Sequence, residues 1–173
     1  LSQQNVEVAF FNNSRYQQGP IFNNSLGYKE TKIHYGRVLN PDDEISSLNI
    51  PGDSPNYKNA IYYLKGRGLS MYDIMRYNIG YCEGGLYGGM IVIPSYDKDN
   101  QLNFFTARSF YDVKFKHRNP SVSKDIIGFE NQINWDMPIV LVEGGFDAIA
   151  VKINAVPLFG KLISDTLKLK IIE

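Results

Sequence analysis

Two acidic side chains near the C-terminal end of the sequence have the spacing of a metal or phosphate site. Glu143 follows the apolar run 139–142, and Asp147 comes a helical turn later, with Gly144 and Gly145 among the residues between them. One or two carboxylates, together with substrate phosphates, commonly hold Mg²⁺ in proteins. An acidic residue here can also simply complement the dipole of a helix N-terminus. The pair is therefore a candidate metal or catalytic site, and a purely structural role is the alternative.

The densest group of positive side chains lies between residues 111 and 125. It consists of Lys114, Lys116, His117, Arg118 and Lys124. Arginine binds phosphate through paired hydrogen bonds, and lysine binds it as a point charge. The lysines and the arginine are thus candidate contacts for nucleotides or nucleic acid, against the alternative of a solvated surface loop. His117 is expected to be an ordinary surface residue.

Alternating elements at the C-terminal end must position the acidic pair. The sequence predicts an apolar strand from residue 138 that is covered on both faces, a helix over 145–153, a short strand over 155–160, and a helix capped by Ser164 or Asp165. This β-α-β-α order predicts parallel strands with a right-handed connection. Since ligand sites in such sheets lie at the carboxyl ends of the strands, Glu143 falls at the expected edge. The sequence ends where a third strand is expected to begin.

The preceding part of the chain predicts a helical cap and an antiparallel β region. Residues 56–82 predict two helices, the second with Ser70 as its N-cap and Asp73 completing a capping box. Residues 87–110 predict a strand over Met90–Ile93, a turn over Asp97–Asn100 and a second strand over Leu102–Arg108. The expected fold class is α+β. It is divided into a linker or small N-terminal subdomain over 1–55, a subdomain over 56–137 and an α/β unit over 138–173.

The composition excludes several classes of protein. The 173 residues carry 18 basic and 18 acidic side chains, so the chain is not held to nucleic acid mainly by its net charge. Cys82 is the only cysteine, which excludes an internal disulfide and a cysteine-based zinc site, and it is expected to be a buried apolar residue. No apolar run is long enough to span a membrane.

Two sets of segments resemble known families. "LVEGGFDAIAV", with Glu143, Gly144 and Asp147, resembles the Glu-Gly-x-x-Asp turn of the TOPRIM domain, the metal-binding fold of primases, topoisomerases and some nucleases. The segments "YLKGRGLSMYDIMRYNIGYC", "IPSYDKDNQLNFFTARSF" and "KHRNPS" are similar, in the same order, to the catalytic core of bacterial and phage DNA primases. These upstream segments favour a primase over a TOPRIM nuclease or topoisomerase.

The resemblance implies an enzyme that makes RNA primers on a single-stranded DNA template during replication. It implies Mg²⁺ or Mn²⁺ as cofactor, ribonucleoside triphosphates as substrates, a replicative helicase as partner, and a cytoplasmic location in a bacterial cell or a phage-infected host. Glu143 becomes a metal ligand and catalytic carboxylate, with Asp147 as its helper. The residues expected to hold template or nucleotide phosphates are Arg108, Lys114, Lys116, Arg118 and Lys124. Arg108 and Lys116 are expected to face the cleft that contains Glu143.

The sequence also departs from the primase pattern. Gly88 and Gly89 stand where an arginine-rich segment leads into the first strand, and the zinc ribbon that usually precedes the core is absent. The family's Asp-x-Asp metal ligands are expected beyond Glu173. The chain by itself is therefore expected to be inactive and to bind metal weakly or not at all. The alternative function is a non-catalytic platform, attached to a helicase, on which Phe104 and Phe105 stack the bases of single-stranded DNA.

Overall fold

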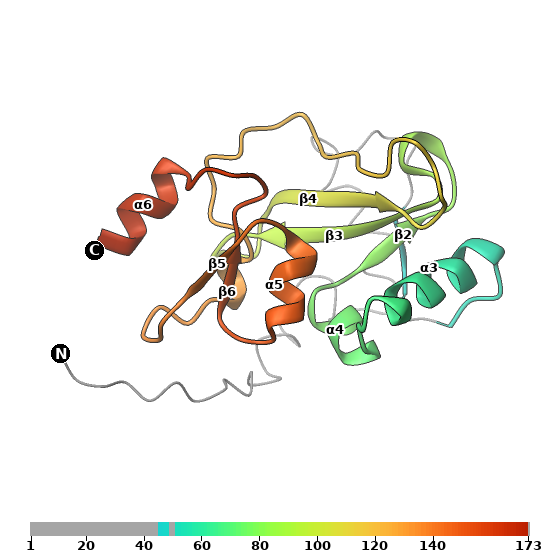
Figure 1. Ribbon diagram of the computed structural model, residues 1–173, viewed down its shortest axis with the longest axis horizontal. Helices are drawn as coiled ribbons and strands as arrows, with labels where there is room; N and C mark the ends of the chain where they lie inside the picture. The colour runs from blue at the N-terminus through green and yellow to red at the C-terminus, as the bar shows by residue number, and fades with distance from the viewer. Residues whose placement is uncertain (1–44, 49–50, 173) are drawn as a thin grey trace.

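A four-stranded antiparallel sheet forms the centre of the molecule (Figure 1). The computed structural model describes residues 45–48 and 51–172. The strands, which neighbour one another in chain order, are β1 (Ile45–Ser47), β2 (Gly80–Cys82), β3 (Met90–Tyr96) and β4 (Leu102–Ser109). Helices lie at one end of this sheet and a small α/β unit packs at the other, so the architecture is mixed α+β, as predicted.

The hairpin of β3 and β4 is the longest paired element. Its turn is closed by the Asp97 carboxylate, which accepts hydrogen bonds from the backbone N–H groups of Asp99 and Gln101. β3 runs three residues beyond the predicted end at Ile93, through Pro94 to Tyr96. Pro94 is tolerated because β2 pairs only with the first part of β3, so the missing N–H faces no partner strand.

Two helices cover one end of the sheet, as the sequence predicts, but the predicted helical region 56–82 is too long, because Gly80–Cys82 pairs with β1 and β3 as strand β2. α3 (Pro55–Gly66) begins at Ser54, whose hydroxyl accepts a hydrogen bond from a backbone N–H of the first turn. α4 (Met71–Arg76) begins with the predicted capping box of Ser70 and Asp73. These caps are local features, since each joins residues that are three positions apart.

The predicted β-α-β-α order is confirmed in the C-terminal part. β5 (Val140–Val142) and β6 (Ala155–Pro157) pair in parallel, with α5 (Gly145–Val151) between them in the chain. α6 (Asp165–Ile172) follows, and the Ser164 hydroxyl caps it. β5 is packed on both faces, as predicted, because Val140 and Val142 lie against the main hydrophobic cluster and Leu141 lies against another, although all three side chains are only half-buried. β6 is its only strand partner within the described residues.

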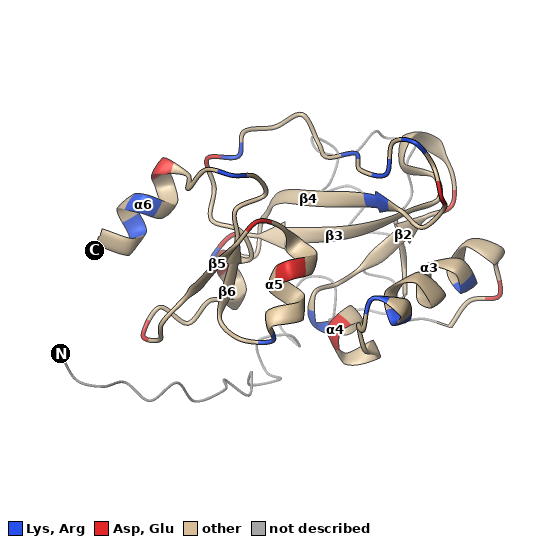
Figure 2. Cartoon of the chain, viewed as in Figure 1, with Lys and Arg blue, Asp and Glu red and all other residues tan. Residues whose placement is uncertain are grey.

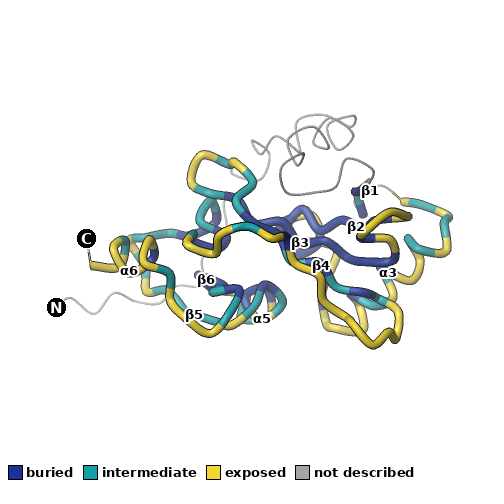
Figure 3. The backbone as a smooth tube through the Cα atoms, turned by 90° about the horizontal axis from the view of Figure 1, so that it is seen from above, coloured by how far each residue is buried: buried dark blue, intermediate teal, exposed yellow. Residues whose placement is uncertain are grey.

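One hydrophobic cluster joins the three parts. It includes Leu64 of α3, Ile93 of β3, Phe104 of β4 and Ile149 of α5, all fully buried. Figure 3 shows the continuous burial of the central strands and the exposure of α6 and the loops. The cluster crosses position 137/138, where the sequence analysis placed a subdomain boundary, so that division stays a prediction.

Two short 3₁₀ turns complete the described elements, namely η1 (Gly85–Tyr87) and η2 (Glu130–Gln132). No described helix has the length and apolar character needed to cross a membrane. The predicted linker or small subdomain over residues 1–55 lies largely outside the described residues. Cys82 is fully buried, as predicted.

Candidate functional site

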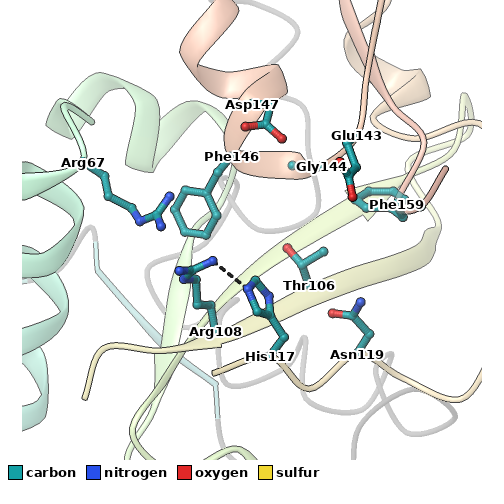
Figure 4. A pocket seen from close by; sticks show the side chains of 12 residues that line it. Arg67, Thr106, Arg108, His117, Asn119, Glu143, Gly144, Phe146, Asp147 and Phe159 are labelled. Carbon is teal, nitrogen blue, oxygen red and sulfur yellow. Dashed lines mark hydrogen bonds between the residues drawn. The ribbon is translucent and has the colours of Figure 1, made fainter. Parts of the chain in front are cut away.

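A cavity of about 260 Å³ opens where α5, the end of β4 and the end of α3 meet. Figure 4 shows the side chains that line it. They are those of Arg67, Thr106, Arg108, His117, Asn119, Glu143, Phe146, Asp147 and Phe159, together with three glycines. Basic and acidic residues are interspersed along the described part of the chain (Figure 2), and the cavity gathers both kinds in one place.

The acidic side of the cavity, which we call the carboxylate wall, consists of Glu143 and Asp147. Glu143 stands at the carboxyl end of β5, and Asp147 lies in the first turn of α5. Gly144, the N-cap of α5, leaves room for Asp147, because a Cβ atom there would lie 3.2 Å from the Asp147 Oδ2 atom. Both carboxylates lie across the cavity from Arg108 and His117 (Figure 4).

Side-chain alternation along β4 places Arg108 in the same cavity. Residues two apart in a strand face the same side, so Phe104, Thr106 and Arg108 share one face of the sheet. The first of them packs on Phe159, with 4.7 Å between ring centroids, and the next two line the cavity. The prediction that Arg108 faces the Glu143 cleft is confirmed.

His117 lies beside Arg108 because the chain after β4 turns back along it. The backbone N–H of Ser109 donates to the carbonyl of Lys116, and Arg118 N–H donates to Ala107, which sets His117 opposite Arg108. The Arg108 Nη1 atom lies 2.6 Å from His117 Nε2. Since a guanidinium can only donate, the imidazole accepts through Nε2 and carries its proton on Nδ1.

The electrostatics of this corner keep His117 neutral. Partial burial, and then the positive charges of Arg108 and Arg67, lower the pKa of His117 below its ordinary value of 6.5. A neutral imidazole leaves both guanidinium groups as the fixed positive charges of the cavity. We call Arg67, Arg108 and His117 the cationic wall.

Arg67 is held at the mouth of the cavity by aromatic rings. Its guanidinium lies 4.6 Å from the ring centroid of Phe146, and its Nε donates a 2.8 Å hydrogen bond to the Tyr63 hydroxyl. These contacts fix a side chain that is otherwise exposed to solvent. An arginine held in this way is suited to planar, paired contact with phosphate oxygens.

Two polar atoms in the cavity lining have no protein partner. Thr106 Oγ1 and Arg108 Nε are buried and make no hydrogen bond to any described residue. Buried polar atoms normally have a partner, because leaving one unsatisfied costs about 1–3 kcal/mol. A polar ligand or ordered water in the cavity would supply the missing bonds.

The other predicted phosphate contacts lie elsewhere. Lys116 does not line the cavity, since its ammonium pairs with Asp112 at 2.8 Å, and the prediction that it faces the Glu143 cleft is wrong. Lys114 lies over the ring of Phe115, and Arg118 donates to the carbonyl of Leu86. Lys124 donates to the Phe159 carbonyl at 2.7 Å, which braces the loop after β6 beside the cavity. Nucleic-acid binding by these four residues stays a prediction.

The structure also adds residues that the sequence analysis missed. Arg67, Thr106 and Asn119 were not named as site residues, and His117 was taken for an ordinary surface residue. Arg67 and Asn119 lie in the "RGLS" and "KHRNPS" segments that carry the primase resemblance, which is the one signal that could have pointed to them. His117 lies in the same "KHRNPS" segment, but its position beside Arg108 depends on the backbone pairing with β4.

Phe104 and Phe105 cannot stack on bases. Both side chains are 0% exposed, because they alternate into hydrophobic clusters on opposite faces of the sheet. The version of the platform hypothesis that used these two rings is therefore wrong.

The carboxylate wall offers part of a divalent metal site. Glu143 and Asp147 line the same cavity, and carboxylate oxygens are what Mg²⁺ prefers. Within the described residues, no group of three or more His, Cys, Asp or Glu side chains converges on one point. The donor set thus fits an ion that takes further ligands from phosphates and water, as Mg²⁺ commonly does.

Comparison with solved structures defines the class of fold. The chain is similar to a DnaG primase catalytic domain bound to single-stranded DNA, with a TM-score of 0.59 and 19% identity over 69% of this chain and 52% of that one. The Escherichia coli primase catalytic core gives a TM-score of 0.55 and 18% identity over 69% and 53% of the two chains. The RNA polymerase domain of Mycobacterium tuberculosis primase DnaG gives 0.57 and 13% identity over 92% and 61%. The chain has the fold of bacterial primase catalytic cores, as the resemblance implies.

Curated relatives leave the function open. The chain is 30% identical over 120 residues to the uncharacterized protein MG010 of Mycoplasma genitalium, a match that covers 63% of this chain and 54% of the relative. It is 31% identical over 122 residues to the MG010 homolog of Mycoplasma pneumoniae, covering 63% and 55%. The matched region spans about half the length of these relatives. No family model matches the chain.

Proposed function

We propose that this chain contributes the template- and nucleotide-holding part of a primase, which joins ribonucleoside triphosphates into primers on single-stranded DNA. The observation that carries the proposal is the cavity in which the carboxylate wall faces the cationic wall, on a fold shared with primase cores. One of the similar structures holds single-stranded DNA, which supports a DNA template as the ligand. A replicative helicase partner and a cytoplasmic location are further proposals that rest on the same resemblance.

The cationic wall binds phosphate in this proposal. Arg108 is oriented by its hydrogen bond to the neutral His117, and Arg67 by its contacts with Tyr63 and Phe146. Neither guanidinium forms a salt bridge with a carboxylate of the described residues, because the salt bridges there all involve lysines. Thr106 Oγ1 and Arg108 Nε, which have no hydrogen-bond partner among the described residues, are candidate partners for a bound phosphate once it displaces the groups that cover them.

The carboxylate wall holds the metal in this proposal. Glu143 would bind Mg²⁺ or Mn²⁺, and Asp147 would assist from the adjacent turn of α5. When bound, the ion neutralises the negative charge that develops on phosphate oxygens during nucleotidyl transfer. The open position of Glu143 beside flexible glycines allows its oxygens to reach an ion that is shared with a substrate.

Residues 1–173 alone are not expected to make primers. Two carboxylates leave most positions around Mg²⁺ to phosphates and water, so the ion should bind weakly without a substrate. The absence of metal-dependent primer synthesis by this chain is therefore compatible with the proposal, and the decisive assay uses the longest native form of the protein.

The test is Glu143→Gln in that longest form. Primer synthesis on a single-stranded template should fall by about a hundredfold or more, because the substitution removes a charge used mainly in the transition state. Affinity for the DNA template should change less than about twofold, since the cationic wall is untouched. Asp136→Asn, which changes a carboxylate outside the cavity, is the matched control and should keep normal activity.

A non-catalytic DNA-binding platform is the second candidate. The observation that favours it is that only two carboxylates line the cavity. Near-normal primer synthesis by the Glu143→Gln variant, or a wild-type protein that binds template and makes no primers at all, would make the platform the better assignment.

A further inference from the structure

A second hollow, which we call the aromatic groove, lies beside the cavity on the outer side of α3. Its volume is about 620 Å³, within the range of about 300–1,000 Å³ typical of ligand clefts. Its main lining residues are Tyr62, Tyr63, Lys65, Arg67, Phe110 and Tyr111. Among the described residues, the lining thus contains four aromatic rings, two positive charges and no acidic side chain.

The rings of the aromatic groove are accessible, in contrast to those of the sheet. Tyr62 is 82% exposed and Tyr111 is 44% exposed, whereas Phe104 and Phe105 are 0% exposed. Residues three or four apart in a helix lie on the same side. Asn59, Tyr62, Tyr63 and Gly66 therefore lie along one side of α3 and form one side of the groove. Large rings that remain exposed in a groove are typical of binding surfaces.

Tyr111, on the opposite side of the groove, is held rigidly. Its hydroxyl donates a 2.6 Å hydrogen bond to Asn56 Oδ1 and accepts a longer one from Asn59. Its ring lies against Gly89, where a Cβ atom would come within 2.8 Å of the ring carbons. A ring fixed before the ligand arrives loses little conformational freedom on binding.

Arg67 connects the two hollows. It lines both the cavity and the aromatic groove, with its guanidinium held over Phe146 on one side and bonded to Tyr63 on the other. A strand whose phosphate rests on Arg67 can therefore place one neighbouring nucleotide toward the cavity and the next toward the groove. Lys65 adds a second positive charge along that path.

We propose that the aromatic groove is a stacking subsite for the single-stranded DNA that enters the cavity. Bases stack on Tyr62 and Tyr111, while Arg67 and Lys65 neutralise the phosphates between them. This inference rests on the proposed function, because the strand it binds is the template. Base stacking on aromatic side chains tolerates any sequence, so the subsite adds affinity without sequence preference.

The principal test is Tyr62→Ala, measured by fluorescence anisotropy with a labelled single-stranded oligonucleotide. Affinity should fall about tenfold, since loss of one base–aromatic stack commonly has this effect. The dependence of affinity on salt should stay unchanged, because no charge is removed. Lys65→Ala should instead lower the salt slope by about one unit.

Three controls separate stacking from damage to the fold. Tyr62→Phe keeps the ring and should retain affinity, while Tyr72→Ala changes a half-exposed tyrosine of α4 that lies outside the groove. An oligonucleotide with abasic sites should bind wild-type and Tyr62→Ala chains equally. If Tyr62→Ala binds normal DNA as well as Tyr72→Ala does, the stacking subsite is excluded.

The outcomes also distinguish this inference from the proposed function. If Arg108→Ala weakens binding of single-stranded DNA and Tyr62→Ala does not, template binding at the cavity is supported and the stacking subsite is excluded. If the wild-type chain binds no single-stranded DNA at all, both fall. Tighter binding of a single-stranded RNA of the same sequence, lost in Tyr62→Ala, would assign the groove to the primer strand and overturn the template assignment.

Discussion

The two walls of the cavity are built on different kinds of support. The cationic wall stands on β4, whose inner face is buried in the main hydrophobic cluster, and on the end of α3. The carboxylate wall stands on β5, a three-residue strand with half-buried side chains and one described strand partner. The proposed phosphate-binding side therefore has a well-buried support within this chain. The proposed metal-binding side has a less buried support, which further packing against β5 would stabilise.

The largest effect that tests this contrast is on stability. Phe104→Ala should lower the free energy of unfolding by about 4 kcal/mol, because it empties a fully buried site beneath the cationic wall. Val142→Ala, beneath the carboxylate wall, should cost about 1 kcal/mol, since its side chain is half-buried. Urea unfolding followed by circular dichroism measures both, and equal losses would contradict the contrast.

The next effect concerns the ion pair that links α4 to α5, the helix that carries Asp147. Asp73 is buried, caps α4, and pairs with Lys152 at the end of α5 at 2.5 Å. Burial alone would raise the pKa of Asp73, but hydrogen bonds from Lys152 and Ser70 outweigh it and lower the pKa below its ordinary value of 3.8. Asp73→Asn keeps an oxygen that can accept from Ser70 but removes the charge that pairs with the half-exposed Lys152, so it should cost about 1 kcal/mol.

The pH dependence of this link has a defined sign. A lowered pKa in the folded chain means that the stabilisation is complete above the ordinary value of 3.8 and is lost as pH falls through the folded pKa. The difference in unfolding free energy between the wild type and Asp73→Asn should thus be constant from neutral pH to about pH 5 and shrink below about pH 4. A difference that persists unchanged at about pH 2 would assign the effect to packing.

Arg108 and Lys116 provide a comparison within one region. Arg108→Gln should weaken single-stranded DNA binding about tenfold and lower the salt slope by about one unit, because it removes a charge from the cavity. Lys116→Ala, whose ammonium pairs with the exposed Asp112, should weaken binding about twofold or less. An anisotropy titration at several salt concentrations distinguishes them, and a larger effect of Lys116 would move the phosphate path out of the cavity.

The smallest expected effect is the pH response of the cationic wall. His117 is neutral near pH 7 because burial and the two neighbouring arginines lower its pKa below 6.5. A bound phosphate favours the protonated ring, so binding should take up a proton and tighten about threefold as pH falls from about 7.5 to 6. His117→Asn should abolish the response, and a response that survives would assign it to another group.

Much of the fold could be predicted because its signals are local. The capping box of Ser70 and Asp73 joins neighbours in the chain, and the apolar run before Glu143 followed by a helical pattern predicts a β-α unit from period alone. The end of β3 was missed, because whether Pro94 breaks a strand depends on where the partner strand β2 ends.

The candidate site also has one part that follows from local sequence and one part that depends on tertiary packing. The sequence by itself determined the carboxylate wall, because Glu143 and Asp147 follow one strand in one turn and their spacing is fixed by the local chain. Only the tertiary structure decided the cationic wall: the return of the chain along β4 brings His117 to Arg108, the end of α3 brings in Arg67, and the same turn directs Lys116 to Asp112. It also buried Phe104 and Phe105 and left Tyr62 and Tyr111 exposed. Residue types state what chemistry a side chain can do, whereas its direction and neighbours depend on register and packing between segments that are distant in sequence.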